Sequence, residues 1–349
     1  MLQHHDPLRV GTTPDPARTS EEGCVAAVDI GGTNLRVAIA DGQGQILARW
    51  SASTVGVREP ELVIDLIHKG VLCALSATKY SLADLKAIGA GAPGITDTDR
   101  GVVIATSYLL GWRDIHFRDL LESAFNVPAA VDNDVNLGAL GEHWMGSARG
   151  TESFVFLAIG TGLGAGIMLE GELFRGSRWT AGEVGYMLVP GTSTAPIEPG
   201  QPGALEGLVG GEGIRTQWRE LWDQGGIPLS RDLSATEIFD HAVQGDLSAK
   251  IILEKTASML AYAVYNIWLI FSCPLFVLGG AIGLHPALAA SIRAQLQGLR
   301  PGVQPKLELS SLAADAQLFG AIRLALDLAH NPQTAARGKQ TKLIETALG

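Results

Sequence analysis

Short apolar runs alternate with helically spaced apolar residues along most of the chain. Short runs bounded by Gly, Pro or acidic turns predict buried strands, and apolar residues three and four positions apart predict helices. The predicted strands are 24–30, 35–40, 45–50, 86–90, 129–131, 154–159, 164–169 and 275–278. The predicted helices are 59–76, 117–125, 135–145, 236–243, 248–271, 286–296 and 313–329. This mixture is typical of an α/β protein.

Two stretches of the chain open with the same pattern of strand, Gly-rich hairpin turn, strand and acidic-Gly turn. Ile30-Gly31 and Asp41-Gly42 fall at the same offsets as Ile159-Gly160 and Glu170-Gly171. The repetition suggests two related lobes that face each other. The length agrees, because 349 residues exceed the size at which one hydrophobic core usually stops growing.

The apolar stretch 259–282 resembles a membrane span at first. It contains Asn266, Ser272 and Pro274, and the proline would end a helix inside the stretch. A buried helix followed by a buried strand is the better interpretation, so we expect a protein that is not embedded in a membrane. Residues 1–22 are polar, lack the apolar core of a signal peptide and are expected to form a loose tail.

The charge and the cysteine content of the chain exclude several classes of function. The formal net charge is −10, whereas a surface built for nucleic acid or anionic lipid needs clustered Lys and Arg. Cys24, Cys73 and Cys273 are isolated from one another, which indicates neither a disulfide framework nor a cysteine-rich zinc site. We therefore expect a protein of the reducing cytoplasm that binds neither nucleic acid nor membrane.

The first motif with chemical content is Asp29-Ile30-Gly31-Gly32-Thr33-Asn34, where a strand runs directly into a Gly-rich hairpin turn. Glycines let the backbone approach a phosphate closely, and N–H groups with the Thr33 hydroxyl can donate to its oxygens. Asp29 at the strand end is a candidate for holding Mg²⁺ through water. An ordinary tight hairpin would use the same glycines.

A second loop of the same design spans residues 160–166, GTGLGAG. It is not a dinucleotide fingerprint, because a strand rather than a helix follows it and no helix N-terminus is available to the pyrophosphate. It is not a Walker loop either, since no GK[ST] follows. Two such loops in one chain suggest that Gly160, Thr161 and Gly162 hold the other end of a triphosphate.

Asp132-Asn133-Asp134-Val135-Asn136 stands at a predicted strand-to-helix junction. Asp and Asn are favoured helix N-caps, but one residue would suffice for a cap. Four polar residues in five positions favour a function, and a carboxylate here can accept a hydroxyl proton late in phosphoryl transfer.

Three weaker motifs complete the set. TAGEVGY at 180–186 and GALE at 203–206 each contain a glutamate that can fix a sugar hydroxyl, although a loop glutamate is usually only solvated. VLGGAI at 277–282 is a strand that runs into Gly279-Gly280. This pair would let an adenosine lie against the backbone, or would simply form a strand-end turn.

Together these motifs resemble the ROK family (repressors, uncharacterised reading frames and sugar kinases) within the actin-like ATPase superfamily. The likeness runs from about residue 24 to 328 and also includes GAPGITDTDRGVV at 91–103. It implies a two-lobed actin-like (ribonuclease H-like) α/β fold in which each lobe is a mixed sheet flanked by helices. Nucleotide and sugar are then expected between the lobes. The expected limits are 23–133 with 313–330 for the small lobe, 134–312 for the large lobe and 331–349 for a second tail.

The resemblance also implies residue roles. Asp134 matches the catalytic base, and Asn133, Glu183, Glu206 and Gly94 match positions at the sugar. The residues matching the nucleotide site are Asp29, Gly31, Gly32, Thr33, Asn34, Gly160, Thr161, Gly162, Gly279 and Gly280. The cofactors implied are ATP and Mg²⁺, and the family favours a homodimer.

Two departures from the family pattern occur together. The family usually has His where this chain has Tyr186, and that His touches the sugar and binds a structural zinc. The family's CxCGxxGCxE zinc motif is replaced by GTSTAPIEPGQPGALE, which contains no cysteine. We therefore predict no zinc site, a loop stiffened by Pro196, Pro199 and Pro202, and a sugar preference altered by the larger Tyr186.

The function expected from the resemblance is an ATP-dependent hexose kinase, with glucose as the default substrate. Mannose, fructose, allose or N-acetylmannosamine as acceptor, and polyphosphate as donor, stay open. A catalytically weak sugar-binding protein is a further possibility. A sugar-responsive repressor is the remote one, because only about 22 polar residues precede the first strand and a helix-turn-helix domain needs more.

Overall fold

A computed structural model of the chain describes residues 23–331, apart from 107–108, 110, 198–200, 227–228, 300–301 and 303. The expected tail at 1–22 lies outside the described residues, as does the second tail apart from Asn331.

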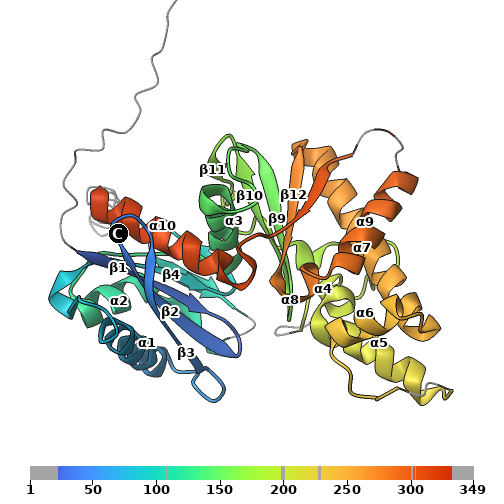
Figure 1. Cartoon of the computed structure of the whole chain (residues 1–349), viewed down its shortest axis with the longest axis horizontal. Coiled ribbons are helices and arrows are strands. Elements are labelled where there is room, and N and C mark those ends of the chain that lie inside the picture. Colours follow the sequence, from blue (N-terminus) through green and yellow to red (C-terminus); the bar gives the residue numbers. More distant parts are fainter. Residues whose placement is uncertain are drawn as a thin grey trace, which may run out of the picture.

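The first sheet has five strands in the order β3-β2-β1-β4-β8 (Figure 1). Its strands are β1 (Cys24–Ile30), β2 (Asn34–Asp41), β3 (Ile46–Ser53), β4 (Leu85–Ala92) and β8 (Ala129–Asn133). The first three are antiparallel neighbours, and β1, β4 and β8 are parallel. Alternate residues of β1 enter two different cores: Ala26 and Val28 pack on one face, and Val25 and Ala27 on the other.

The second sheet repeats this arrangement in the order β11-β10-β9-β12-β13. Its strands are β9 (Phe154–Ile159), β10 (Leu163–Leu169), β11 (Glu172–Leu173), β12 (Leu275–Gly279) and β13 (Lys306–Leu309). Again the first three are antiparallel and the last two continue in parallel. The short sequence repeat therefore predicted a true repetition of topology. The mixed α/β fold with two related sheets is confirmed.

Helices cover both sheets, and a small antiparallel sheet lies beside the first one. That sheet has the order β5-β6-β7, with strands β5 (Ile95–Asp97), β6 (Val102–Ala105) and β7 (Arg113–Ile115). The α-helices are α1 (Pro60–Leu75), α2 (Phe117–Phe125), α3 (Asp134–Met145), α4 (Glu206–Val209), α5 (Gly211–Asp223), α6 (Ala235–Val243), α7 (Leu247–Phe271), α8 (Gly280–Gly283), α9 (Pro286–Leu299) and α10 (Ala316–His330). The 3₁₀ turns are η1 (Leu82–Asp84), η2 (Val184–Tyr186) and η3 (Ala313–Asp315). The sequence patterns missed β5–β7, β11, β13, α4, α5 and α8.

Helices α3 and α10 lie between the two sheets (Figure 1). They cross so closely that glycine is required on both sides. A Cβ on Gly320 of α10 would overlap the Leu137 carbonyl oxygen of α3, and a Cβ on Gly141 of α3 would overlap the Ala316 carbonyl oxygen of α10. The contact therefore joins the helices backbone to backbone.

The membrane-like stretch is a helix followed by a strand, as predicted. Helix α7 ends at Phe271, Ser272 takes a left-handed conformation with φ of 54°, and β12 begins at Leu275. In the described part of the chain, no helix combines the length and apolarity needed to cross a bilayer.

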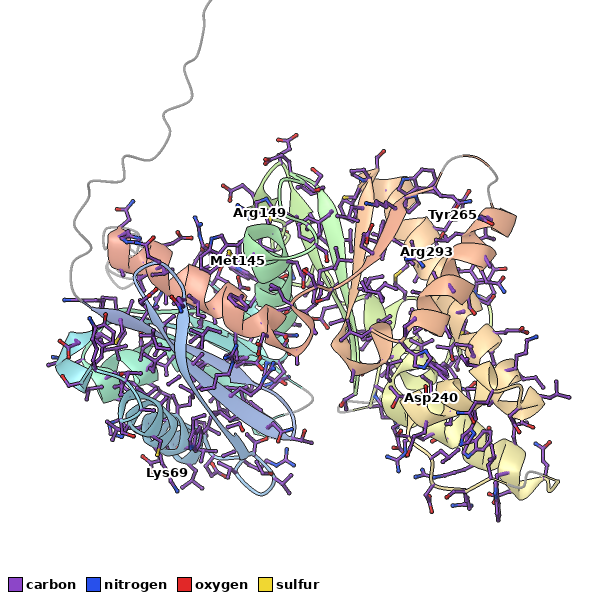
Figure 2. The ribbon with its side chains drawn as sticks, in the orientation of Figure 1. Lys69, Met145, Arg149, Asp240, Tyr265 and Arg293 are labelled. Carbon is purple, nitrogen blue, oxygen red and sulfur yellow. The ribbon has the colours of Figure 1, made fainter. Side chains whose placement is uncertain are left out.

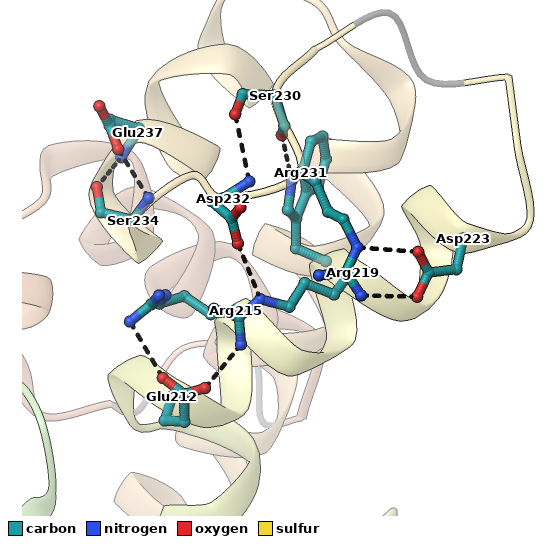
Figure 3. Close-up of polar contacts among 10 residues, drawn as sticks. Glu212, Arg215, Arg219, Asp223, Ser230, Arg231, Asp232, Ser234 and Glu237 are labelled. Atoms are coloured by element: carbon teal, nitrogen blue, oxygen red, sulfur yellow. Dashed lines mark hydrogen bonds and ion pairs between the residues drawn. The ribbon is translucent and has the colours of Figure 1, made fainter.

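Helices α9 and α5, on the outer side of the second sheet, make polar contacts at the surface with a neighbouring strand, with a neighbouring loop and within α5. Arg293 of α9 donates to the Leu307 carbonyl oxygen of β13 at 2.7 Å (Figure 2). Around α5, Glu212 pairs with Arg219, and Asp223 pairs with Arg231 from the following loop (Figure 3). These pairs are exposed, so each contributes little to stability.

The α3–α10 contact yields a direct test. Gly320→Ala should destabilise the protein by about 1–3 kcal/mol, because the methyl group forces the helices apart. Gly298→Ala is the matched control, since it changes a helical glycine of α9 whose Cβ would meet nothing within 4 Å. The control should be neutral or stabilising by up to about 1 kcal/mol. Urea unfolding of both variants measures the difference, and equal effects would contradict the close contact.

Candidate active site

The candidate base Asp134 is the first residue of α3, directly after β8. The helix is capped by its neighbour: the Asn133 side-chain oxygen accepts the N–H groups of Val135 and Asn136 at 2.8 and 3.1 Å. Asn133 also donates through Nδ2 to the Gly94 carbonyl oxygen at 2.8 Å. Helix capping therefore explains why Asn stands at position 133, but it does not explain the carboxyl group at Asp134.

Gly94 sits where only glycine fits. Its φ is +93°, and a Cβ there would overlap the Ala105 carbonyl oxygen. The left-handed turn presents the Gly94 carbonyl to Asn133, so the segment 91–94 and the end of β8 are held as one unit.

The surroundings of Asp134 disfavour its charged form. Its pKa is raised to about 8, first by burial and then by the negative charges of Asp29 and Glu183, against an opposing hydrogen bond from the Val135 N–H. The structure thus brings the predicted metal ligand, the predicted base and a predicted sugar ligand within electrostatic reach of one another. Perturbed carboxyls of this kind concentrate at functional sites.

Asp29, the last residue but one of β1, lies opposite Arg36 of β2. Arg36 donates through Nε and Nη2 to Oδ2 of Asp29, at 2.9 and 2.6 Å. Burial raises the pKa of Asp29, and the charge of Arg36 opposes that shift. Arg36 also donates to the Ala314 carbonyl oxygen and to Gln317 at the start of α10. Sequence reasoning missed Arg36, although its place seven residues after Asp29 across a tight hairpin signals a cross-strand pair.

The two predicted phosphate loops are matching hairpin turns. The Gly31 N–H donates to the Asn34 carbonyl at 2.8 Å, and the Gly160 N–H donates to the Gly162 carbonyl at 2.9 Å. Thr33 and Thr161 are both exposed at the tips. A Cβ on Gly160 would find its nearest atom at 3.9 Å, so packing within the chain does not require this glycine. The exposed turns, with open space at Gly160 of the second one, therefore suit a ligand that approaches the backbone.

The prediction that no helix N-terminus is available at the second loop was wrong. Helix α5 begins at Gly211, and the Gly211 N–H donates to the Gly160 carbonyl oxygen at 2.9 Å. The helix begins about fifty residues further along the chain, so the sequence next to Gly160 does not predict it. Gly210-Gly211 before the helically spaced Ile214 and Trp218 was the available signal.

The two candidate sugar glutamates lie in one neighbourhood. Burial raises the pKa of Glu183, and the charge of Glu206 raises it further. Glu206 accepts the Leu163 N–H at 2.8 Å through Oε2, which ties the start of α4 to the start of β10. Tyr186 follows Glu183 in the 3₁₀ turn η2, with its side chain 48% exposed.

Comparison with known proteins agrees with this geometry. The family model described as "ROK family" matches residues 25–328. The chain belongs to the ROK family. It is 31% identical to a glucokinase of Halalkalibacterium halodurans over 73% of this chain and 79% of that protein.

Two further ROK relatives widen the comparison. The glucokinase of Streptomyces griseus, solved in complex with glucose and AMPPNP, superposes with a TM-score of 0.74 at 26% identity and covers 87% of this chain and 100% of that chain. A xylose repressor of Caldicellulosiruptor bescii is 26% identical over 90% of this chain and 81% of that protein. The kinase similarities support a carbohydrate kinase of actin-like fold, in a family that also contains repressors.

The segment in which the expected zinc motif is missing is joined to the 3₁₀ turn η2 by main-chain contacts. The Leu205 N–H donates to the Gly185 carbonyl oxygen at 2.9 Å. Gly203 packs so closely on Gly185 that a Cβ would overlap its carbonyl oxygen. The Thr192 hydroxyl donates to the Val189 carbonyl at 2.8 Å and closes a turn. These bonds connect Tyr186 to the segment that carries Glu206. Pro199 lies outside the described residues, so stiffening by the prolines stays a prediction.

The glycine pair expected at the adenosine is explained by packing. A Cβ on Gly279 would overlap the Phe156 ring, and one on Gly280, whose φ is +77°, would overlap the Ile159 carbonyl oxygen. These glycines therefore give no independent evidence for a nucleotide contact, and their role in a ROK kinase site stays a prediction.

The raised pKa of Asp134 predicts a pH-dependent stability. The folded carboxyl keeps its proton up to about pH 8, whereas the unfolded one releases it near its ordinary value of 3.8. Stability from this group is therefore present at low pH and is lost as pH rises towards 8, by at most about 1.4 kcal/mol per pH unit. Asp134→Asn cannot ionise and should gain stability relative to wild type between about pH 5 and pH 8. Urea unfolding in magnesium-free buffer measures this, and a pH-independent difference would refute it.

The missing zinc motif predicts insensitivity to chelation. Among the described residues, no group of three or more His, Cys, Asp or Glu side chains is arranged to hold a metal. Dialysis against a zinc chelator should leave the thermal midpoint and, once Mg²⁺ is restored, the activity unchanged. Zinc analysis of the protein before and after dialysis is the control. A lowered midpoint with release of stoichiometric zinc would show the prediction to be wrong.

Proposed function

We propose that this protein is an ATP-dependent hexose kinase whose preferred acceptor is glucose, which it converts to glucose 6-phosphate. The observation that carries the proposal is the junction of three carboxyls from different elements at Asp134, where burial, Asp29 and Glu183 all raise the pKa. Asp29 belongs to a candidate phosphate hairpin and Glu183 to a candidate sugar loop. A base that stands between a phosphate site and a sugar site is the arrangement that phosphoryl transfer to a hydroxyl needs.

Asp134 acts on the attacking sugar hydroxyl. As the sugar oxygen bonds to the γ-phosphorus, the bond from that phosphorus to the bridging oxygen of ADP breaks, and the carboxylate of Asp134 takes the hydroxyl proton. The products are the sugar phosphate, ADP and a protonated Asp134 that releases its proton to solvent. Because the free carboxyl has a pKa of about 8, an approaching cation favours catalysis by lowering that pKa.

The residues present suit Mg²⁺ at Asp29. Both Arg36 bonds end on Oδ2, and the other carboxylate oxygen has lone pairs of the kind that magnesium or its water ligands prefer. Bound Mg²⁺ would neutralise charge on the β- and γ-phosphate oxygens. Arg36 holds the Asp29 carboxylate near the end of β1, two residues before Gly31 of the hairpin turn.

The remaining roles follow from the positions of the loops. The two hairpins, with Thr33, Asn34 and Thr161 at exposed tips, bind the phosphates through N–H and hydroxyl donors. Asn133, Glu183, Glu206 and Tyr186 surround the sugar, and Gly94 orients Asn133. Adenosine lies near Gly279 and Gly280. We also propose a cytoplasmic homodimer with lobe boundaries at Asn133 and Ala313, where β8 ends and η3 begins.

Two alternatives rest on the same site. Another hexose as acceptor, or polyphosphate as donor, would use the same base and hairpins. A sugar-responsive repressor would bind sugar without turnover, and the presence of the carboxyl at 134 near both Asp29 and Glu183 favours the kinase over it.

The test is a coupled assay of sugar-dependent ADP formation over a panel of hexoses, with polyphosphate as a second donor. We expect turnover that is fastest with glucose and ATP. Asp134→Asn should reduce kcat by about 10²–10⁴-fold, the range that general base catalysis supplies. Asp327→Asn makes the same chemical change at an exposed ion pair of α10 and should leave kcat unaltered. No turnover with any sugar, or full activity in Asp134→Asn, would exclude the proposal.

A further inference from the structure

Arg175 follows β11 in the chain and reaches the end of β8, so it joins the two large sheets. Its Nε and Nη2 both donate to Oδ2 of Asp132, at 3.0 and 2.6 Å. Asp132 is only 1% exposed, whereas the Arg175 side chain is partly open at 27%. The pair thus buries one carboxylate completely and places a single guanidinium beside the strand that leads into Asp134.

The second oxygen of Asp132 fixes the backbone around the base. Its Oδ1 accepts the Asn133 N–H at 2.7 Å and Nδ2 of Asn136 at 3.0 Å. Asp132 therefore holds the residue before Asp134 and a residue of the first turn of α3. With Arg175 on Oδ2, both carboxylate oxygens are engaged, and rotation of the Asp132 carboxylate would break bonds on each side.

The main chain of Arg175 closes the loop that precedes Glu183. Its carbonyl oxygen accepts the Ala181 N–H at 3.2 Å, so residues 176–180 form a loop with Arg175 and Ala181 at its base. Gly182 follows, with φ of +93° and a carbonyl that accepts the Ala165 N–H of β10 at 2.9 Å. Glu183 comes next in the chain. The ends of the loop that delivers Glu183 are thus defined by Arg175 and by β10.

We propose that Arg175 is a positioning residue that sets the sugar-binding loop against the base, by pairing with Asp132 through its side chain and with Ala181 through its main chain. This inference rests on the proposed sugar kinase function. Its loss leaves a buried carboxylate uncompensated and lets the loop and the base move apart. Lys is not an equivalent replacement, because its single ammonium nitrogen cannot place two donor nitrogens on Oδ2 of Asp132, as Nε and Nη2 of Arg175 do.

Kinetics distinguish positioning from general stability. In Arg175→Met and Arg175→Lys we expect the KM for sugar to rise and kcat to fall, each by about tenfold or more, since small misplacements can cost as much as about a hundredfold. The KM for ATP should change less than about twofold, because the hydrogen bonds described for Arg175 reach Asp132, Leu173 and Ala181, which lie outside the two phosphate hairpins. Arg231→Met is the matched control: Arg231 also makes two bonds to an aspartate, Asp223, but in an exposed loop after α5 (Figure 3). It should leave all three constants unchanged.

A double variant distinguishes the cost of burying an unpaired charge from the loss of the link between Asp132 and the loop. Asp132→Asn with Arg175→Met removes both charges and should recover much of the thermal midpoint that Arg175→Met loses. The KM for sugar should stay raised, because the link to the loop is still absent. Recovery of the KM together with the midpoint would mean that Arg175 only stabilises the fold, which would overturn the inference.

Hydrogen exchange tests the positioning without any sugar or turnover. In Arg175→Met, amides of residues 176–187 and of the first turn of α3 should exchange faster, while those of β12 should not change. Unchanged exchange at 176–187 would overturn the inference whatever the kinetics show. If wild type phosphorylates no sugar yet this exchange rises as expected, the proposed function fails and the positioning role of Arg175 stands.

Discussion

The position of Asp134, the candidate base, depends on the packing of α3 against three neighbours at once. A Cβ added to Gly91 of β4 would lie 3.0 Å from Cδ1 of Leu137, and one added to Gly164 of β10 would lie 2.9 Å from Cγ2 of Val135. On the third side Gly320 of α10 meets the α3 backbone. Since interiors are close-packed and tolerate little displacement, these contacts fix the helix relative to both sheets. Asp134 at its first turn is fixed with it.

The buried carboxylates around this helix differ in how their charge is compensated. Asp29 is paired with Arg36 and Asp132 with Arg175, and both pairs tie separate segments together. Among the ion pairs of the described residues, none includes Asp134, whose carboxyl instead has Asp29 and Glu183 nearby. Burial without a cation raises its pKa, and a raised pKa gives a carboxylate a stronger tendency to take a proton. Within this cluster an arginine thus compensates Asp29 and Asp132, whereas no ion pair of the described residues compensates Asp134.

Much of the fold could be predicted from the sequence, because its elements are local patterns. The strand at 24–30 and the helix at 117–125 were found to the residue, and the repeat at Gly31 and Gly160 indicated two sheets of one design. Contacts between distant segments could not be predicted. Arg175 lies 43 positions from Asp132, and α5 reaches Gly160 from Gly211. Such contacts arise only when the chain is folded, so a pattern in neighbouring residues does not contain them.

The two hairpins show how one design serves two purposes. In the first, the strand ends carry charge: Asp29 faces Arg36 across β1 and β2. At the corresponding place in the second, Ala158 faces Gly164 across β9 and β10. The small residue Gly164 leaves the space that the Val135 side chain of α3 occupies. One sheet end thus holds the charged pair Asp29–Arg36, whereas the other receives helix α3, which begins at Asp134. A side chain in place of Gly164 would crowd Val135, because a Cβ there would lie 2.9 Å from the nearest atom of Val135, so the divergence of the repeat makes room for α3.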